Sequence, residues 1–189
     1  MTGARDRDDM AETQLIEAGR DLWTAGLVTS HGGNLSSRRG RSGALISGTG
    51  AMLGRLSPGT LVPVNAAGRP DGVPGPEPSS DTRIHLAIYQ AHAEAGAVIH
   101  AHPVHAIALA FDCDVIEPRN LEGRLFLGRV PVIDAEWEES AGPVAAALRA
   151  HPIVMVRGHG SYACGADVWD AMRVTSALEE SAQIIVLTR

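Results

Sequence analysis

The chain has 189 residues, of which 44% are hydrophobic and 4% aromatic, and its formal net charge at pH 7 is −6. This length is typical of one domain with a sizeable core. The arginines are dispersed and no apolar run is long enough to span a bilayer, so we expect no nucleic-acid partner and no membrane anchor.

All 16 basic residues are arginine, and the sequence contains no lysine. Schiff-base catalysis requires a lysine amine, and the phosphate-binding loop of nucleotide hydrolases requires a Gly-Lys pair. Both chemistries are therefore excluded. The two cysteines, Cys113 and Cys164, match no paired-ligand spacing, and no leader-like segment opens the sequence. These features predict free thiols in a cytoplasmic protein.

Residues 1–10 are charged, and we expect them to form a flexible N-terminus. Beyond them, helical periodicity and short apolar runs bounded by glycine or proline predict alternating elements. In chain order these are a helix from 11 that ends near Gly26, strands at 35–38, 44–47 and 61–64, a helix at 81–95 capped by Ser79 or Ser80, a strand at 97–102, a helix at 104–111, a strand at 130–133, a helix at 140–149, a strand at 153–156 and a helix at 168–187. This order predicts one α/β domain over 11–189 with three layers, a mixed or antiparallel central sheet flanked by helices.

Two histidines follow an apolar run that reads as a buried strand. Residues 97–99 lead into His100 and His102, which are spaced i, i+2. Side chains two apart on a strand point to the same face, so the two imidazoles lie close enough to hold one ion. Pro103 has no amide hydrogen and ends the strand there, where a cleft is expected. The alternative is a pair of ordinary histidines packed at a strand end.

A third histidine has the same context. His159 lies between two glycines directly after the apolar strand at 153–156. Three histidines with an open position are typical of catalytic zinc, because structural sites use four protein ligands. His105 competes for this role through its His-x-His-x-x-His spacing, but it follows a proline at the start of a helix. The predicted ligands of a divalent cation, Zn²⁺ first and Mn²⁺, Fe²⁺ or Co²⁺ otherwise, are His100, His102 and His159.

Together these motifs resemble the class II aldolase/adducin family over about residues 11–187. The motifs that carry the resemblance are Gly33-Asn34-Leu35-Ser36, Leu45-Ile46-Ser47-Gly48-Thr49-Gly50, Pro78-Ser79-Ser80-Asp81, Val98-Ile99-His100-Ala101-His102 and Gly158-His159-Gly160, with Glu179 on the following helix. The resemblance implies that the three histidines hold a divalent cation, usually zinc. It also implies a homotetramer with sites near the subunit interfaces.

The resemblance further implies a phosphate pocket formed by Gly33, Asn34, Thr49, Gly50, Ser79 and Ser80. Hydroxyls, turn amides and a helix N-terminus can bind an anion without a cationic side chain, which suits a chain without lysine. The alternative is that the serines only cap a helix and the glycines only form turns.

Asp81 occupies the position where the aldolases of the family carry a catalytic glutamate and the epimerases an aspartate. The resemblance therefore implies that Asp81 is the acid/base, although a carboxylate in the first turn also favours the helix dipole. The family prototypes use tyrosines for proton transfer, one of them in a C-terminal tail. The tyrosines here are Tyr89, within a helix, and Tyr162, just after His159, and the candidate proton donors are instead Glu117 and Glu122.

The expected function is that of a metal-dependent aldolase, which cleaves or forms a C–C bond of a phosphorylated ketose through a metal-stabilised enediolate. The alternatives on the same scaffold are a sugar-phosphate 4-epimerase, a 3-oxo-acid decarboxylase and a sugar-phosphate dehydratase. The adducin branch adds another class, a non-enzymatic interaction module, against which the retained histidines argue. We expect a cytoplasmic homotetramer whose partner is a small phosphorylated sugar.

Overall fold

The computed structural model of the chain describes residues 2–72 and 75–189. One sheet of eight strands runs through the centre in the order β3-β2-β1-β4-β8-β7-β6-β5. The strands are β1 (Asn34–Arg39), β2 (Gly43–Ser47), β3 (Leu61–Val64), β4 (Ala97–Ala101), β5 (Val115–Ile116), β6 (Val130–Ile133), β7 (Ile153–Val156) and β8 (Gly160–Gly165). Neighbouring strands are antiparallel except β6 and β7, which are parallel, so the sheet is mixed.

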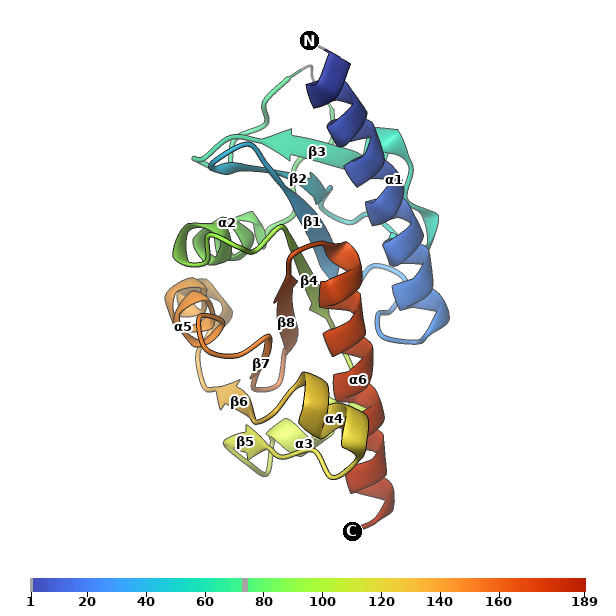
Figure 1. Ribbon diagram of the computed structural model, residues 1–189, viewed down its shortest axis with the longest axis vertical. Coiled ribbons are helices and arrows are strands. Elements are labelled where there is room, and N and C mark those ends of the chain that lie inside the picture. Colours follow the sequence, from blue (N-terminus) through green and yellow to red (C-terminus); the bar gives the residue numbers. More distant parts are fainter. Residues whose placement is uncertain (1, 73–74) are drawn as a thin grey trace.

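Helices cover both faces of this sheet (Figure 1). On one face lie α1 (Thr2–Thr24), α3 (Val104–Ala110), α4 (Leu121–Phe126) and α6 (Val168–Leu187), and on the other lie α2 (Thr82–Ala91) and α5 (Ala141–Ala147). The described residues also form three short 3-10 helices, η1 (Leu53–Arg55), η2 (Pro58–Thr60) and η3 (Trp137–Glu139). The predicted three-layer α/β fold is confirmed. Within the described residues, no helix combines the length and the apolar composition needed to cross a membrane.

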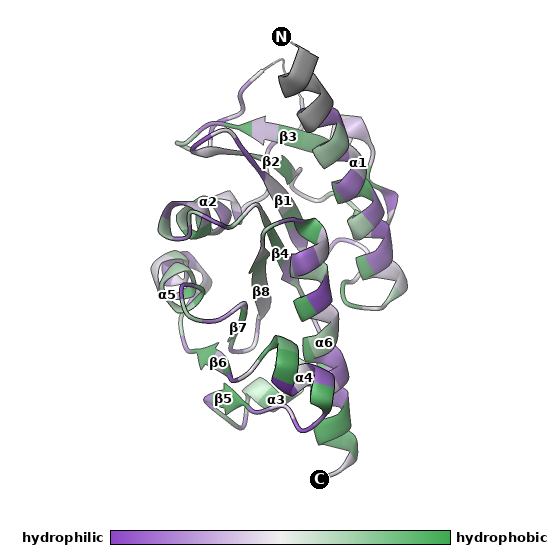
Figure 2. Ribbon diagram, viewed as in Figure 1, coloured by the Kyte–Doolittle hydropathy of each residue, from purple (hydrophilic) through white to green (hydrophobic). Residues whose placement is uncertain are grey.

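The core consists of two hydrophobic clusters, one on each face of the sheet. Strand alternation divides β4 between them, because Ala97 and Ile99 pack with α1 and α6 while Val98 packs with α2 and α5. Figure 2 shows β7 in the colours of hydrophobic residues and both colours along α6, as expected for a central strand and a covering helix.

The register of the three central strands decides which side chains meet. Asn34 on β1 pairs with His100 on β4, and His100 pairs with Tyr162 on β8. Paired residues on neighbouring strands point to the same face, so these three side chains form one row across the sheet. The row lies at the end of β4, which stops at Ala101.

Helix boundaries differ from the predicted ones at two places. α1 begins at Thr2, so residues 2–10 are helical, and the flexibility expected of residues 1–10 stays a prediction. α2 ends at Ala91 rather than 95, and its N-cap is Asp81 rather than one of the two serines before it. The serines instead form the turn that leads into the helix, in which Thr82 donates to the Ser79 carbonyl oxygen.

Strand β8 has no counterpart among the predicted elements. Its sequence, Gly-Ser-Tyr-Ala-Cys-Gly, begins and ends with glycine and contains only one residue with strong strand propensity. Its position between β4 and β7 supplies the strand pairing that local propensity does not. The short elements β5 and α4 likewise lie between the predicted helix at 104–111 and the predicted strand at 130–133, where the sequence indicates only a loop.

We expect the Leu178→Ala substitution to lower the free energy of unfolding by about 2–5 kcal/mol, because it leaves a cavity in the core. Leu178 is 0% exposed, whereas Leu187 on the same helix is 74% exposed. The matched change Leu187→Ala should shift the free energy by about 0.5 kcal/mol or less. Urea unfolding of both variants checks this, and equal losses would contradict the assignment of the buried face of α6.

Candidate active site

One cleft contains the predicted metal ligands, the predicted acid/base and the predicted phosphate-binding residues. Its volume is about 370 Å³. The predicted residues in its lining are Gly33, Asn34, Thr49, Gly50, Ser79, Ser80, Asp81, His100, His102 and His159, and the further ones are His31, Gly32, Gly48, Ala51 and Trp137. No arginine is among these described lining residues, so the walls carry no permanently cationic side chain.

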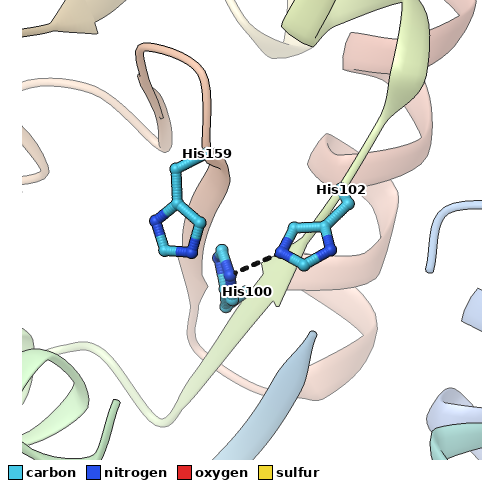
Figure 3. Close-up of side chains that lie close together, drawn as sticks. All are labelled: His100, His102 and His159. Atoms are coloured by element: carbon cyan, nitrogen blue, oxygen red, sulfur yellow. Dashed lines mark hydrogen bonds between the residues drawn. The ribbon is translucent and has the colours of Figure 1, made fainter. Parts of the chain in front are cut away.

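His100 belongs to β4 and His102 directly follows it, and their rings approach each other as the i, i+2 spacing predicts (Figure 3). The two Nε2 atoms are 2.9 Å apart. Nδ1 of His100 lies 2.9 Å from the carbonyl oxygen of Ser161. A carbonyl oxygen only accepts hydrogen bonds, so Nδ1 carries the hydrogen and Nε2 keeps a free lone pair, as in many histidine ligands.

His159 reaches this pair from the turn between β7 and β8. Gly158 has φ +68°, a left-handed conformation that other residues rarely adopt. A Cβ atom at Gly160 would stand 2.7 Å from Cδ2 of His102 and 3.0 Å from Cε1 of His100. The two glycines therefore allow the His159 ring to lie with its centroid 4.6 Å from that of His100 and 5.7 Å from that of His102.

The three rings fit a metal ion. Their nitrogen atoms lie within 4.8 Å of one another, so they could hold one ion, and nitrogen donors suit zinc and related cations. Burial lowers the pKa of His100 to about 3 and also lowers the pKa of His102 and of His159. The rings are therefore neutral at neutral pH, which is the form that binds metal. Nδ1 of His159 is buried without a hydrogen-bond partner among the described residues, a cost that a nearby cation would offset.

His105, the competing third ligand, lies outside this cluster. Its Nδ1 is 2.7 Å from Oε1 of Glu179. The same carboxylate accepts hydrogen bonds from the backbone amides of His105 and Ala106 at the start of α3, where the N-cap Pro103 offers no side-chain cap. Glu179 thus caps α3 and fixes His105, and the geometry favours His159 as the third ligand.

Asp81 is the carboxylate of the cleft. Although it is the N-cap residue of α2, its side chain makes no capping hydrogen bond. Its Oδ2 accepts hydrogen bonds from Nδ2 of Asn34 at 3.0 Å and from the Tyr162 hydroxyl at 2.9 Å. Its Oδ1 accepts one from Nε1 of Trp137 at 2.6 Å, and Oδ2 lies 3.7 Å from Nε2 of His100. The carboxylate therefore faces the histidines rather than the helix backbone.

The charge state of Asp81 follows from these contacts. Burial alone would raise the pKa of Asp81. In the acid range where this carboxyl group would take up a proton, His100 is itself protonated, and its positive charge together with the hydrogen bonds from Asn34 and Trp137 outweighs burial and holds the pKa of Asp81 well below its usual range. Burial and the charge of Asp81 raise the pKa of Tyr162, so its hydroxyl keeps its hydrogen. The carboxyl group is ionised at neutral pH and can accept a proton.

Trp137 is a site residue that sequence reasoning misses. It lies in η3, 56 positions from Asp81. The Arg83 guanidinium lies 4.5 Å from the centroid of its ring and donates a hydrogen bond to its carbonyl oxygen. Arg83 thus fixes the tryptophan that donates to the carboxylate. No motif surrounds Trp137, so only the fold reveals this contact.

Two further side chains around the carboxylate differ from what the sequence suggests. Tyr162, to which the sequence assigns no role, stacks on His100 with ring centroids 4.3 Å apart. His85, which looks like an ordinary helix residue in the sequence, is fully buried, and its Nε2 lies 2.6 Å from Oδ1 of Asn34. Recognition of β8 as a strand would have placed Tyr162 beside His100.

The predicted phosphate-binding residues gather near the N-terminus of α2 and in two glycine turns. Oγ of Ser79 accepts a hydrogen bond from the Asp81 amide at 3.2 Å, which leaves its hydroxyl hydrogen free for a ligand. Thr49 and Ser80 are exposed. Asn34 also lines the cleft, but its amide contacts Asp81. These donors and the helix N-terminus suit an anion, and phosphate binding stays a prediction.

The second tyrosine and the two candidate proton donors lie away from the cleft. The Tyr89 hydroxyl is buried and lies 2.8 Å from Oγ of Ser36. Glu117 forms an ion pair with Arg129, with 3.0 Å between the charged atoms. Glu122 is exposed on α4. None of these three residues contributes to the cleft within the described part of this chain.

Comparisons with known proteins cover nearly the whole chain. Residues 13–186 match the family model described as class II aldolase and adducin N-terminal domain. A methylthioribulose-1-phosphate dehydratase from Pseudomonas savastanoi pv. phaseolicola is 32% identical over 188 residues, which cover 90% of this chain and 91% of that protein. The crystal structure of L-fuculose-1-phosphate aldolase from Thermus thermophilus has a TM-score of 0.84 and 35% identity, covering 95% of this chain and 94% of that chain. The crystal structure of YgbL from Escherichia coli has a TM-score of 0.82 and 26% identity, covering 94% of this chain and 89% of that chain.

We expect about one divalent ion per chain and its loss in His100→Ala, His102→Ala and His159→Ala, because a site with three protein ligands has no redundancy. The matched control His105→Ala should keep the ion, since His105 contacts Glu179 instead. Metal analysis of the purified variants checks this. An empty site in His105→Ala together with a filled one in His159→Ala would show that the third ligand is misassigned.

Proposed function

The chain belongs to the class II aldolase and adducin family, and from this membership we propose that it is a metal-dependent lyase acting on a phosphorylated ketose. Relatives with a named activity are a dehydratase and an aldolase, both lyases, and the chain is accordingly an enzyme rather than a non-enzymatic interaction module. The observation that carries the proposal is the ionised Asp81 carboxylate, 3.7 Å from His100 in the cleft where three histidines converge.

The family depends on a divalent metal ion, and the ligands we propose are His100, His102 and His159, with zinc as the ion. When bound, such an ion withdraws electron density from the carbonyl and hydroxyl oxygens of the substrate. The role of the chain in this chemistry is to supply three neutral nitrogen ligands and to leave the remaining coordination positions open to the substrate.

Asp81 is proposed as the group that exchanges a proton with the substrate. A carboxylate has about four lone-pair positions, and three of them accept the hydrogen bonds from Asn34, Tyr162 and Trp137. The fourth is on Oδ1 and can accept a proton from a substrate hydroxyl. The three donors hold the carboxylate in place while this happens, so the proton transfer needs little reorganisation.

We rank C–C bond cleavage first among the possible reactions. Cleavage begins when a base removes the proton of a substrate hydroxyl, and the same proton can return to the carbon released by the broken bond. Dehydration needs an acid that protonates the departing hydroxyl, in addition to a base that removes a C–H proton. Among the described residues that line the cleft, Asp81 is the only carboxyl group. Dehydration is the second candidate because the curated dehydratases match this chain over 90% of its length.

We also propose a cytoplasmic homotetramer. Val104 on α3 and Leu121 and Leu125 on α4 are exposed apolar side chains, which a subunit contact would remove from water. The proposal is supported by the position of Val104 on α3, the helix that directly follows the strand of the metal site.

A panel of phosphorylated ketoses, including L-fuculose 1-phosphate and methylthioribulose 1-phosphate, tests the function. We expect an aldehyde and a shorter keto phosphate as products, and the unphosphorylated sugars should react poorly. Ser79→Ala and Thr49→Ala should mainly raise KM, because the phosphate is bound equally in the ground and transition states. Water loss without an aldehyde would favour the dehydratase, and equal turnover of unphosphorylated sugars would contradict the pocket.

Asp81→Asn should fold and keep its metal but lose about 10²-fold or more in kcat, because an amide cannot exchange the proton. Asp21→Asn, a change of an exposed aspartate on α1, is the matched control. Steady-state kinetics and metal analysis of both variants check the prediction. The Asp81→Glu variant distinguishes two kinds of site. It should remain active if the site accepts the longer glutamate of the family's aldolases, and it should lose activity if the site requires the shorter aspartate. Unchanged kcat in Asp81→Asn would remove Asp81 from the reaction.

A further inference from the structure

A chain of buried polar side chains leads from Asp81 away from the cleft. It passes through Asn34, His85 and Ser36 to Tyr89, and all of them are buried. Two of these, Asn34 and Ser36, alternate on β1, and the other two, His85 and Tyr89, follow Asp81 at intervals of four along α2. One helix face and one strand face are thus joined by hydrogen bonds rather than by apolar packing.

The hydrogen bonds of this chain all run in one direction. Nδ2 of Asn34 donates to Asp81, so Oδ1 of Asn34 is the atom 2.6 Å from Nε2 of His85. A carbonyl oxygen only accepts, and therefore Nε2 of His85 carries the hydrogen. Burial lowers the pKa of His85 to about 4, so the ring is neutral and its Nδ1 has a free lone pair.

The hydrogen bonds on the other side of the His85 ring run in the same direction. Nδ1 lies 2.7 Å from Oγ of Ser36, and the serine hydroxyl is the donor there because Nδ1 has no hydrogen. The Ser36 hydrogen points to His85, so the Tyr89 hydroxyl is the donor in its 2.8 Å contact with the same Oγ, and the Ser36 carbonyl oxygen is a second acceptor at 3.1 Å. With the opposite tautomer, the bare Nε2 of His85 would face the carbonyl oxygen of Asn34, and the two acceptors would repel each other.

The amide of Asn34 needs this support because its two orientations have nearly the same shape. In one orientation the NH₂ group donates to Asp81, and in the other the amide oxygen faces the carboxylate. The hydrogen on Nε2 of His85 favours the first orientation, because it can be donated to the amide oxygen of Asn34 only when the NH₂ group faces Asp81. We propose that His85 is a positioning residue, which orients the Asn34 amide and through it holds the Asp81 carboxylate for proton transfer, a role that rests on the proposed function of Asp81.

The kinetic test compares His85→Leu with His85→Gln. Leucine removes the donor to Asn34, so we expect kcat to fall about 10–100-fold while KM changes little and the metal stays bound. Glutamine carries an amide nitrogen at nearly the reach of Nε2, so it should restore most of kcat. His92→Leu, at the end of the same helix, is the matched control and should leave kcat unchanged. Unchanged kcat in His85→Leu, or the same loss in both variants at His85, would overturn the proposal.

The spectroscopic test does not depend on activity. In ¹⁵N-labelled protein, long-range ¹H–¹⁵N spectra report which ring nitrogen of His85 carries the hydrogen, and His85→Gln identifies the signals. We expect a neutral ring with hydrogen on Nε2 at pH 7. Hydrogen on Nδ1, or on both nitrogens, would overturn the proposal whether or not any substrate is cleaved. If His85→Leu fails to fold, this measurement and the kinetics of His85→Gln still decide the question. A protein inactive on every substrate but with hydrogen on Nε2 would refute the proposed function and leave the orientation of Asn34 supported.

Discussion

A buried negative charge is costly unless hydrogen-bond donors surround it, and this requirement at Asp81 organises the whole cleft. The donors come from three elements that are distant in the sequence, namely Asn34 on β1, Tyr162 on β8 and Trp137 in η3. None of the three carries a charge, so the carboxylate stays ionised without being neutralised by a salt bridge to an arginine. A carboxylate that accepts hydrogen bonds in this way but is not paired with a cationic side chain can still interact with a substrate.

The sheet register links this carboxylate to the histidines. Asn34, His100 and Tyr162 form one row across β1, β4 and β8. The outer two members donate to Asp81, and the middle one belongs to the cluster that could hold the ion. Tyr162 also stacks on His100. A displacement of any one of the three strands would therefore disturb the carboxylate and the metal site together.

Much of the site could be predicted because it follows from local rules. The i, i+2 spacing of His100 and His102 places both on one face, and the glycines around His159 indicate a tight turn after a buried strand. Trp137 and His85 could not be predicted, because their roles depend on which strand and which helix lie opposite them. The spacing of His85 and Tyr89 indicates one helix face, but the strand that this face meets is a property of the tertiary fold. Strand β8 was not predicted for a related reason, because its pairing with neighbouring strands, rather than the strand propensity of its residues, makes it a strand.

The lack of arginine among the lining residues has a consequence for the response to salt. Hydroxyls, backbone amides and a helix N-terminus act on a ligand at contact distance, whereas formal charges at the surface act over about a Debye length and are screened by dissolved ions. A phosphate in the proposed pocket would therefore gain little from long-range attraction to its side chains and would lose little of that attraction when the ionic strength rises. The chain itself has a net charge of −6, so added salt even weakens the general repulsion of an anionic sugar. If the proposed pocket binds phosphate in this way, its affinity should be kept or slightly increased as the ionic strength rises.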